Sequence, residues 1–170
     1  MHKAESPQTS PATSKRKAEY FARVARDVSK YGCHIVSVFD PEGEEPDFSY
    51  SVGVQQTSRA PEVIVLGLRA ELAAFVINEY NRRVRAGKRF RRGKRYAGFL
   101  DGFPVYFEPV RASRLKEYTL GCDRFYGDET YAVMQIIYPT TKGVWPWNKT
   151  APESFKCHQP MLGRAWPNRP

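Results

Sequence analysis

Cysteine is scarce in this 170-residue sequence, and long apolar runs are absent from it. Three scattered cysteines are too few for a disulfide scaffold, so we expect reduced thiols and a cytoplasmic protein. No stretch approaches 18 consecutive apolar residues, which excludes a transmembrane helix and argues against a membrane partner. The first 14 residues lack an apolar core, so we expect no signal peptide. Because 41% of the residues are apolar, a wholly disordered chain is excluded as well.

Acidic residues are absent from a stretch that is crowded with basic ones. Residues 82–95, which we call the basic segment, contain nine cations and no carboxylate: Arg82, Arg83, Arg85, Lys88, Arg89, Arg91, Arg92, Lys94 and Arg95. The whole chain has 27 basic and 18 acidic residues, so 18 of each remain outside the basic segment. The net charge of +9 therefore lies in one short stretch.

The composition of the basic segment predicts contact with nucleic acid or another polyanion. Lysine and arginine neutralise phosphates, and aromatic rings such as Phe90 and Tyr96 can stack on unpaired bases. The pattern does not distinguish DNA from RNA. Two alternatives remain open, namely an acidic protein partner and a solvated loop that pairs with the acidic stretch Asp40–Asp47.

The periodicity of the apolar residues predicts two main helices and a hairpin. Helical spacing indicates one helix over residues 14–31 and another over Arg69–Ala86. A period of two over Cys33–Val54 predicts two strands joined by a turn. In the second of these strands, Ser49 and Ser51 are expected to form a wet or ligand-facing side.

The order of the elements predicts the fold class and the domain boundaries. Further strands are expected at Val63–Leu66, Phe103–Glu108 and Tyr131–Tyr138. We therefore expect a single α+β domain with a mostly antiparallel sheet and two main helices, over residues 15–150. A disordered arm is expected at residues 1–14, and an irregular tail containing proline and tryptophan at residues 151–170.

Several short motifs follow one another in a fixed order. They are Tyr31-Gly32-Cys33-His34, Phe48–Val54, Pro61–Leu68, Gly102–Val105, Phe125-Tyr126-Gly127, Val133-Met134-Gln135 and Trp145-Pro146-Trp147. In these motifs, which span roughly residues 31–148, the chain resembles the bacterial proteins of the DUF4262 family, a domain of unknown function. The resemblance implies a soluble, single-domain bacterial protein and indicates no substrate.

A second resemblance suggests a small-ligand pocket. The strand, loop and strand around residues 50–65 resemble the phosphate-holding loop of flavin-reductase-like split barrels, which is an analogy of fold only. By this analogy a phosphate would contact Ser51, Thr57, Ser58 and Arg59, and a ring would be covered by Trp145 or Trp147. The candidate pocket also includes His34, Tyr50 and Gln135. No cofactor is predicted from the residues themselves, so a flavin enters only through this analogy.

Gln135 lies in the middle of an apolar run, where a buried amide requires hydrogen-bond partners. We expect it either to bind a neighbouring backbone group, which is the commoner arrangement, or to line a cavity.

Metal binding and nucleophilic catalysis are not predicted. Zinc ligands usually lie two to four residues apart, whereas Cys33-His34 and Cys157-His158 are adjacent pairs. Adjacent strand residues point to opposite faces, so Cys33 and His34 do not converge on one ion. The chain also lacks a G-x-S-x-G turn for a serine nucleophile, and no catalytic residue is assigned.

The sequence therefore favours a protein that binds nucleic acid or another polyanion through the basic segment. The alternatives are an enzyme or sensor that uses a phosphorylated small ligand such as a flavin, and a protein-interaction module.

Overall fold

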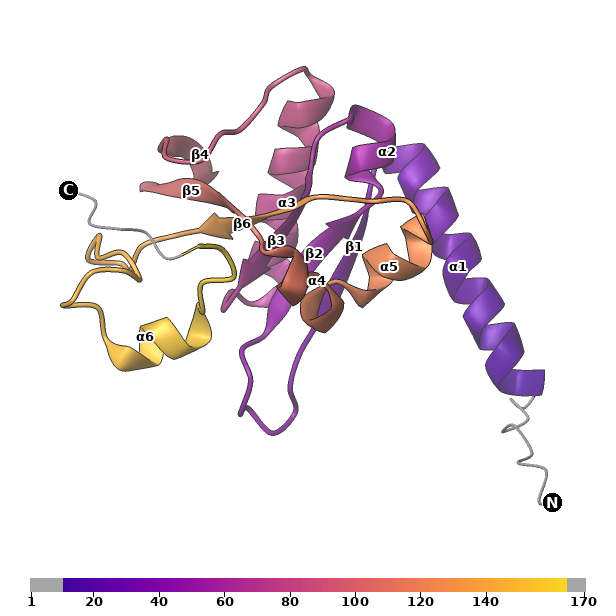
Figure 1. Cartoon of the computed structure of the whole chain (residues 1–170), viewed down its shortest axis with the longest axis horizontal. Helices are drawn as coiled ribbons and strands as arrows, with labels where there is room; N and C mark the ends of the chain where they lie inside the picture. Colours follow the sequence, from indigo (N-terminus) through magenta and orange to yellow (C-terminus); the bar gives the residue numbers. More distant parts are fainter. Residues whose placement is uncertain (1–10, 165–170) are drawn as a thin grey trace.

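The computed structural model describes residues 11–164, so most of the predicted arm and the end of the tail lie outside the described residues. Six strands and six helices are found in this part of the chain (Figure 1). In chain order they are α1 (Pro11–Tyr31), β1 (His34–Val38), β2 (Phe48–Val52), α2 (Val54–Ser58), β3 (Glu62–Leu66), α3 (Ala70–Arg85), β4 (Tyr96–Leu100), β5 (Phe103–Pro109), α4 (Ala112–Tyr118), α5 (Leu120–Tyr126), β6 (Val133–Ile137) and α6 (Glu153–His158).

The strands form one sheet in the order β1-β2-β3-β6-β5-β4. The α+β class is confirmed, but the sheet is mixed, because β3 runs parallel to β6 and the other neighbouring pairs are antiparallel. A parallel pair needs a long crossover connection. Here the connection consists of α3, the β4–β5 hairpin, α4 and α5, and it therefore adds two short helices to the two long ones expected; α2 and α6 lie outside it.

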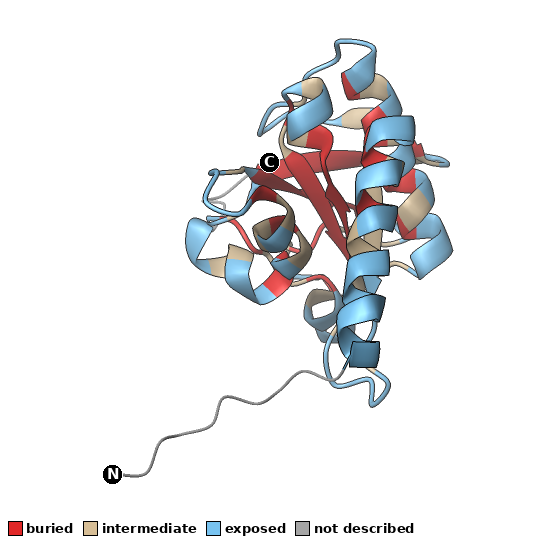
Figure 2. Ribbon diagram, turned by 90° about the vertical axis from the view of Figure 1, so that its right-hand side faces the viewer, coloured by how far each residue is buried: buried red, intermediate tan, exposed pale blue. Residues whose placement is uncertain are grey.

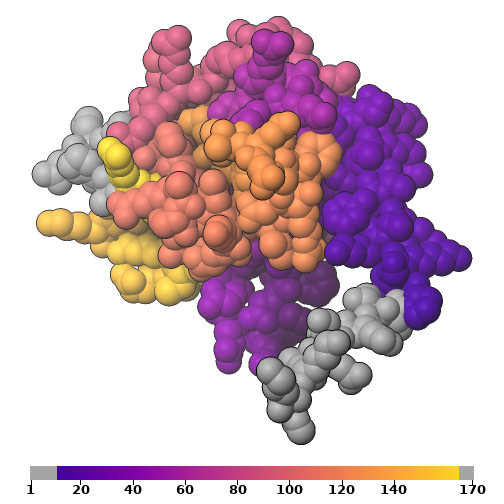
Figure 3. Space-filling model, turned by 45° about the vertical axis from the view of Figure 1, so that its right-hand side comes forward, coloured from indigo at the N-terminus to yellow at the C-terminus, as the bar shows by residue number. Residues whose placement is uncertain are grey.

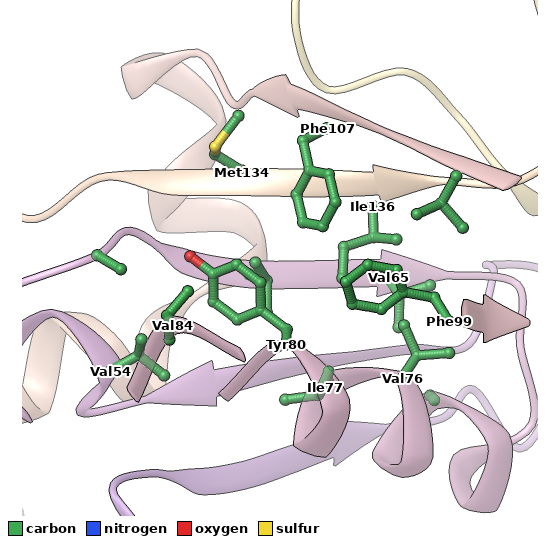
Figure 4. Packing of buried hydrophobic residues seen from close by; sticks show 14 of the residues in the cluster. Val54, Val65, Val76, Ile77, Tyr80, Val84, Phe99, Phe107, Met134 and Ile136 are labelled. Atoms are coloured by element: carbon green, nitrogen blue, oxygen red, sulfur yellow. The ribbon is translucent and has the colours of Figure 1, made fainter. Parts of the chain in front are cut away.

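Helices cover both faces of the sheet (Figure 2). On one face, α3 packs Val76, Ile77 and Tyr80 against Val65 and Phe107 of the sheet (Figure 4). On the other face, α1, α4 and α5 pack against the side chains of β2 and β3 that point away from α3. The sheet is therefore buried from both sides, which accounts for the continuous apolar run in β3.

The expected wet side of β2 is buried instead. Ser49 is 2% exposed and Ser51 is fully buried, because they lie on the sheet face that α3 covers. The hydroxyl groups have partners: Ser49 Oγ lies 2.8 Å from Ser37 Oγ, and Ser51 donates to Glu62 at 2.5 Å. Small polar residues in this strand thus mark the close approach of a helix rather than contact with solvent.

The long helices agree with the sequence analysis better than the short elements do. α3 is one residue shorter at each end than expected, and α1 begins at Pro11, so residues 11–14 are helical rather than part of an arm. The elements α2, α4, α5 and α6 were not predicted, since helices of five to seven residues are too short to show a helical period. β4 was also missed; it contains Gly98 at φ +84°, where a Cβ would lie 2.5 Å from the Arg83 guanidinium.

The tail after residue 150 is packed against the sheet and contains a helix, so the expectation of irregular structure is corrected for its described part. Leu162 is 1% exposed. Gln135 holds this segment, because its Nε2 donates to the carbonyl of Pro160 at 2.8 Å and its Oε1 accepts the Leu162 N–H at 2.8 Å. The buried amide therefore binds backbone groups, the first of the two arrangements considered for it.

The reactivity of the three thiols tests this packing. Cys33 and Cys122 are buried and Cys157 is exposed, and burial raises the pKa of Cys33 to about 12 and raises that of Cys122 too. Because the thiolate is the reactive form, we expect one thiol per native chain to react rapidly with an aromatic disulfide reagent near pH 8, and all three after denaturation. A rapid phase that persists in Cys157→Ser would contradict this placement.

Candidate nucleic-acid interface

The basic segment crosses one end of the molecule. It starts in the last turns of α3, beside the N-terminal end of β3, where Tyr80 donates to the carbonyl of Pro61 at 2.7 Å. It continues through a loop and ends just before β4. In Figure 3 the corresponding part of the chain lies at the top of the molecule, next to α2.

The acidic stretch Asp40–Asp47 lies at the opposite end of the sheet (Figure 1). It precedes β2, which is antiparallel to β3, and the carbonyl of Asp47 accepts the N–H of Gly67, just after β3. The Asp40 carboxylate accepts backbone N–H groups of its own turn, chiefly that of Glu45, and these bonds lower its pKa. None of the ion pairs in residues 11–164 joins the two stretches, so the internal pairing considered above does not form.

Two cations of the basic segment share one carboxylate on α3. Arg82 and Arg83 contact Glu79 at 2.7 Å and 2.6 Å. The hydrogen bond from Arg82, followed by the one from Arg83, lowers the pKa of Glu79 to about 2. Arg83 also lies over the ring of Phe99 and donates to the carbonyl of Ala97, so it connects α3 to β4.

Two more cations fasten the loop to β5. Arg92 contacts both oxygens of Glu108, at 2.8 Å and 2.7 Å, and the Glu108 side chain is only 2% exposed. Arg95 donates to the Tyr106 hydroxyl at 2.9 Å and lies over the ring of Trp145. These contacts give Arg92 and Arg95 a role within the protein, although both were expected to face a ligand from an exposed loop.

Two further arginines bind the carbonyl ends of helices. Arg85 donates to the carbonyl of Tyr31, the last residue of α1, at 2.9 Å. Arg89 donates to the carbonyls of Ser58, at the end of α2, and of Val84, in the last turn of α3. Carbonyls at helix ends lack partners within their own helix and carry partial negative charge, so cations are favoured there.

The remaining three cations are open to a ligand. Lys88, Arg91 and Lys94 form no ion pair and no side-chain hydrogen bond with the rest of residues 11–164. Together with Arg82, Arg83 and Arg89 they line a hollow of about 670 Å³, which we call the basic hollow.

The aromatic residues Phe90 and Tyr96, within and just after the basic segment, are half-buried and pack against the core. Phe90 stacks on Phe107, with ring centroids 4.5 Å apart, and contacts Tyr80 and Phe99 edge-on or tilted. The Tyr96 hydroxyl accepts the N–H of Arg91 at 2.9 Å. Both rings are half-buried and line the basic hollow, and their packing against the core holds the loop in place.

The residues expected to form a phosphorylated-ligand pocket fall into two groups. One group lies around β2 and α2, before β3: His34, Tyr50, Ser51, Thr57, Ser58 and Arg59. The other group lies at or after β6: Gln135, Trp145 and Trp147. Because β3 and β6 are parallel, residues that precede β3 and tryptophans that follow β6 lie at opposite ends of the sheet. Trp145 and Trp147 stack on each other and contact Tyr106 edge-on, so the structure does not bring them to Thr57–Arg59.

Within the first group, most polar atoms have partners inside the protein. His34 Nδ1 lies 2.8 Å from the Asp27 carboxylate, and the Tyr50 hydroxyl accepts the N–H of Gly121 at 2.9 Å. Thr57 donates to the carbonyl of Gly32 at 2.7 Å. The exceptions are the Ser58 hydroxyl, which is buried without a partner, and the side chain of Arg59, which forms no ion pair or hydrogen bond in the described part of the chain.

A buried carboxylate that the sequence analysis missed positions α2. Glu62, at the start of β3, is fully buried; its Oε1 accepts the N–H groups of Gly53 and Gln55 at 3.0 Å and the hydroxyl of Tyr126. Its Oε2 accepts the Ser51 hydroxyl. Burial and the charge of Glu62 raise the pKa of Tyr126, which keeps this phenol protonated. The acid in an otherwise apolar strand was the available signal in the sequence.

Comparison with known proteins identifies the family. Residues 27–152 match the family described as Domain of unknown function (DUF4262). The chain belongs to the DUF4262 family. The match includes Glu62, α2 and the whole basic segment of this DUF4262 protein, and it ends before α6. No curated protein and no solved structure matches the chain.

In residues 11–164 of the DUF4262 chain, no helix is long and apolar enough to cross a membrane. Nor do three or more side chains of His, Cys, Asp or Glu lie close enough together there to hold a metal ion.

Replacement of Glu62 tests its role as an anchor. In Glu62→Gln, the amide NH2 would face N–H and O–H donors, so we expect unfolding to require about 2–4 kcal/mol less free energy. Tyr126→Phe removes one of the four donors and should cost about 1–2 kcal/mol. Urea denaturation measures both values. Equal stability of Glu62→Gln and the wild type would rule out this role.

The neighbouring residues Arg91 and Arg92 provide a matched pair. Arg92→Ser leaves the buried Glu108 carboxylate without its cation and should destabilise the fold by about 2–3 kcal/mol. Arg91→Ser removes the same charge from the same loop and should change stability by no more than about 0.5 kcal/mol. Similar melting temperatures for the two variants would contradict this division.

Proposed function

We propose that this DUF4262 protein binds nucleic acid through phosphate contacts in the basic hollow. The observation that carries the proposal is that Lys88, Arg91 and Lys94 line one hollow and are not paired with any carboxylate in residues 11–164. Like charges held close together repel one another, and a polyanion relieves this repulsion while releasing its own counterions.

The contacts are expected to be largely independent of sequence. Base-specific recognition requires side chains that reach base edges or stack on unpaired bases. Phe90 and Tyr96 are engaged in the aromatic cluster with Phe107, so they contribute to the shape of the hollow rather than to stacking. Lysine and arginine side chains that contact phosphates provide affinity without reading the sequence.

Salt dependence and charge removal test the proposal. Four cations of the hollow, Lys88, Arg89, Arg91 and Lys94, have no carboxylate partner among the described residues, so the affinity for a mixed-sequence oligonucleotide should fall about a hundredfold between 50 and 200 mM salt. The variant Lys88→Ser/Arg91→Ser/Lys94→Ser should reduce the slope of log affinity against log salt by about 2–3. Fluorescence anisotropy with single-stranded and duplex oligonucleotides measures both effects.

A charge-matched variant controls for the change in net charge. Lys116, Lys142 and Lys149 are exposed and make no ion pair in the described region, so replacing all three with serine removes the same charge elsewhere. This control should bind nearly as tightly as the wild type. If it loses as much affinity as the hollow variant, or if the wild type does not bind at micromolar concentration, the proposal is wrong.

A further inference from the structure

A second, smaller cleft adjoins the basic hollow and shares Arg89 with it. The cleft has a volume of about 350 Å³, at the lower end of the range for small-ligand sites, and lies between the end of α2 and the end of α3. Its lining includes Ser58 and Arg59 from the first of these ends, and Arg85, Gly87 and Arg89 from the second. It thus combines two sets of residues that are distant in the sequence.

The cleft contains three guanidinium groups and no carboxylate. None of the ion pairs in residues 11–164 involves Arg59, Arg85 or Arg89. Arg85 uses one N–H for a carbonyl at a helix end, and Arg89 uses two for such carbonyls and one for the carbonyl of Lys88 in the loop. Since a guanidinium has five N–H groups, both arginines retain donors, held in place by bonds to the backbone.

The carbonyls at the helix ends do not account for the presence of Arg59 in the cleft. Arg85 and Arg89 already bind carbonyls at the ends of α1, α2 and α3, whereas the side chain of Arg59 binds no group in the described part of the chain. Arg59 also has φ +51°, and no other residue apart from glycine has a positive φ in residues 11–164. Glycine or asparagine is favoured at such a position after a helix, and strain of this kind tends to collect at functional sites.

The cleft also contains a hydroxyl group without a hydrogen-bond partner among the described residues, that of Ser58. The Oγ of Ser58 is buried and has no hydrogen-bond partner among the described residues, although most buried polar atoms have one. It precedes Arg59 directly and belongs to the lining of the cleft. Arginine side chains and a hydroxyl donor are the groups that bind the oxygens of a phosphate.

We propose that this cleft binds a phosphomonoester group, such as the 5′-phosphate of a nucleic-acid strand or of a nucleotide. The inference rests on the proposed function in so far as the strand that carries the phosphate would continue into the basic hollow through the shared Arg89. A phosphomonoester carries up to two negative charges, whereas a phosphodiester inside a strand carries one, so a compact site with three guanidinium groups prefers the terminal phosphate.

The test compares oligonucleotides of the same sequence, labelled at the 3′ end, with a 5′-phosphate or a 5′-hydroxyl. The wild type should bind the phosphorylated strand about tenfold more tightly. In Arg59→Gly this advantage should disappear, while the melting temperature stays the same or rises, because glycine adopts positive φ without strain. The advantage should also decrease from pH 7.5 to 5.5, because the second pKa of a phosphomonoester is about 6.

Two control variants separate this inference from the proposed function. Replacing Lys88, Arg91 and Lys94 with serine should weaken the binding of both oligonucleotides by the same factor and preserve the tighter binding of the 5′-phosphorylated one. Lys149→Ala removes one distant charge and should leave that advantage intact. If Arg59→Gly weakens the binding of both oligonucleotides equally, Arg59 belongs to the general basic surface, and a site specific for the phosphomonoester is refuted.

Titration with a nucleoside 5′-monophosphate and with inorganic phosphate distinguishes the source of the group. If calorimetry shows that the nucleoside 5′-monophosphate binds the wild type but not Arg59→Gly, the inference about the cleft is supported even if no oligonucleotide binds. The ligand is then a free nucleotide. A 5′-phosphate effect on oligonucleotides without nucleotide binding supports the cleft and indicates a strand end. If neither the small ligands bind nor the 5′-phosphate alters oligonucleotide affinity, the inference is overturned.

Discussion

The position of the Glu62 carboxylate is the constraint on which the basic surface depends. It is fully buried at the start of β3 and accepts hydrogen bonds from groups in β2, at the start of α2 and in α5. A buried carboxylate is stable only while such donors surround it, so each donor group is held in place. Because the N–H groups of Gly53 and Gln55 are among them, Glu62 fixes α2, whose other end carries Ser58 and Arg59.

The ends of three helices meet near this anchored element. Arg85 binds the last carbonyl of α1, and Arg89 binds carbonyls at the ends of α2 and α3. The partial negative charge of these ends favours nearby cations, which explains how so many arginines can be accommodated close together. The same bonds orient the guanidinium groups and lower the entropic cost of binding an anion with their remaining N–H groups.

The basic segment thus consists of cations with different roles. Arg82 and Arg83 are paired with Glu79 within α3, and Arg92 is paired with Glu108, which holds the loop against β5. Lys88, Arg91 and Lys94 lack such partners in the part of the chain that the structure describes. Charge density in a sequence therefore overstates the surface available to a polyanion, because carboxylates elsewhere in the chain, here Glu79 and the buried Glu108, pair with some of the cations.

The sequence by itself determined the α+β class, the two long helices, five of the six strands and the family, since each depends on periodicity or order along the chain. It also located the cations and singled out Thr57, Ser58 and Arg59. Only the tertiary structure decided that β3 and β6 are parallel, that Ser49 and Ser51 are buried, and that the tryptophans lie far from Arg59. These features depend on contacts between residues distant in the chain, such as Glu62 with Tyr126 or Arg92 with Glu108, which leave no periodic pattern in the sequence.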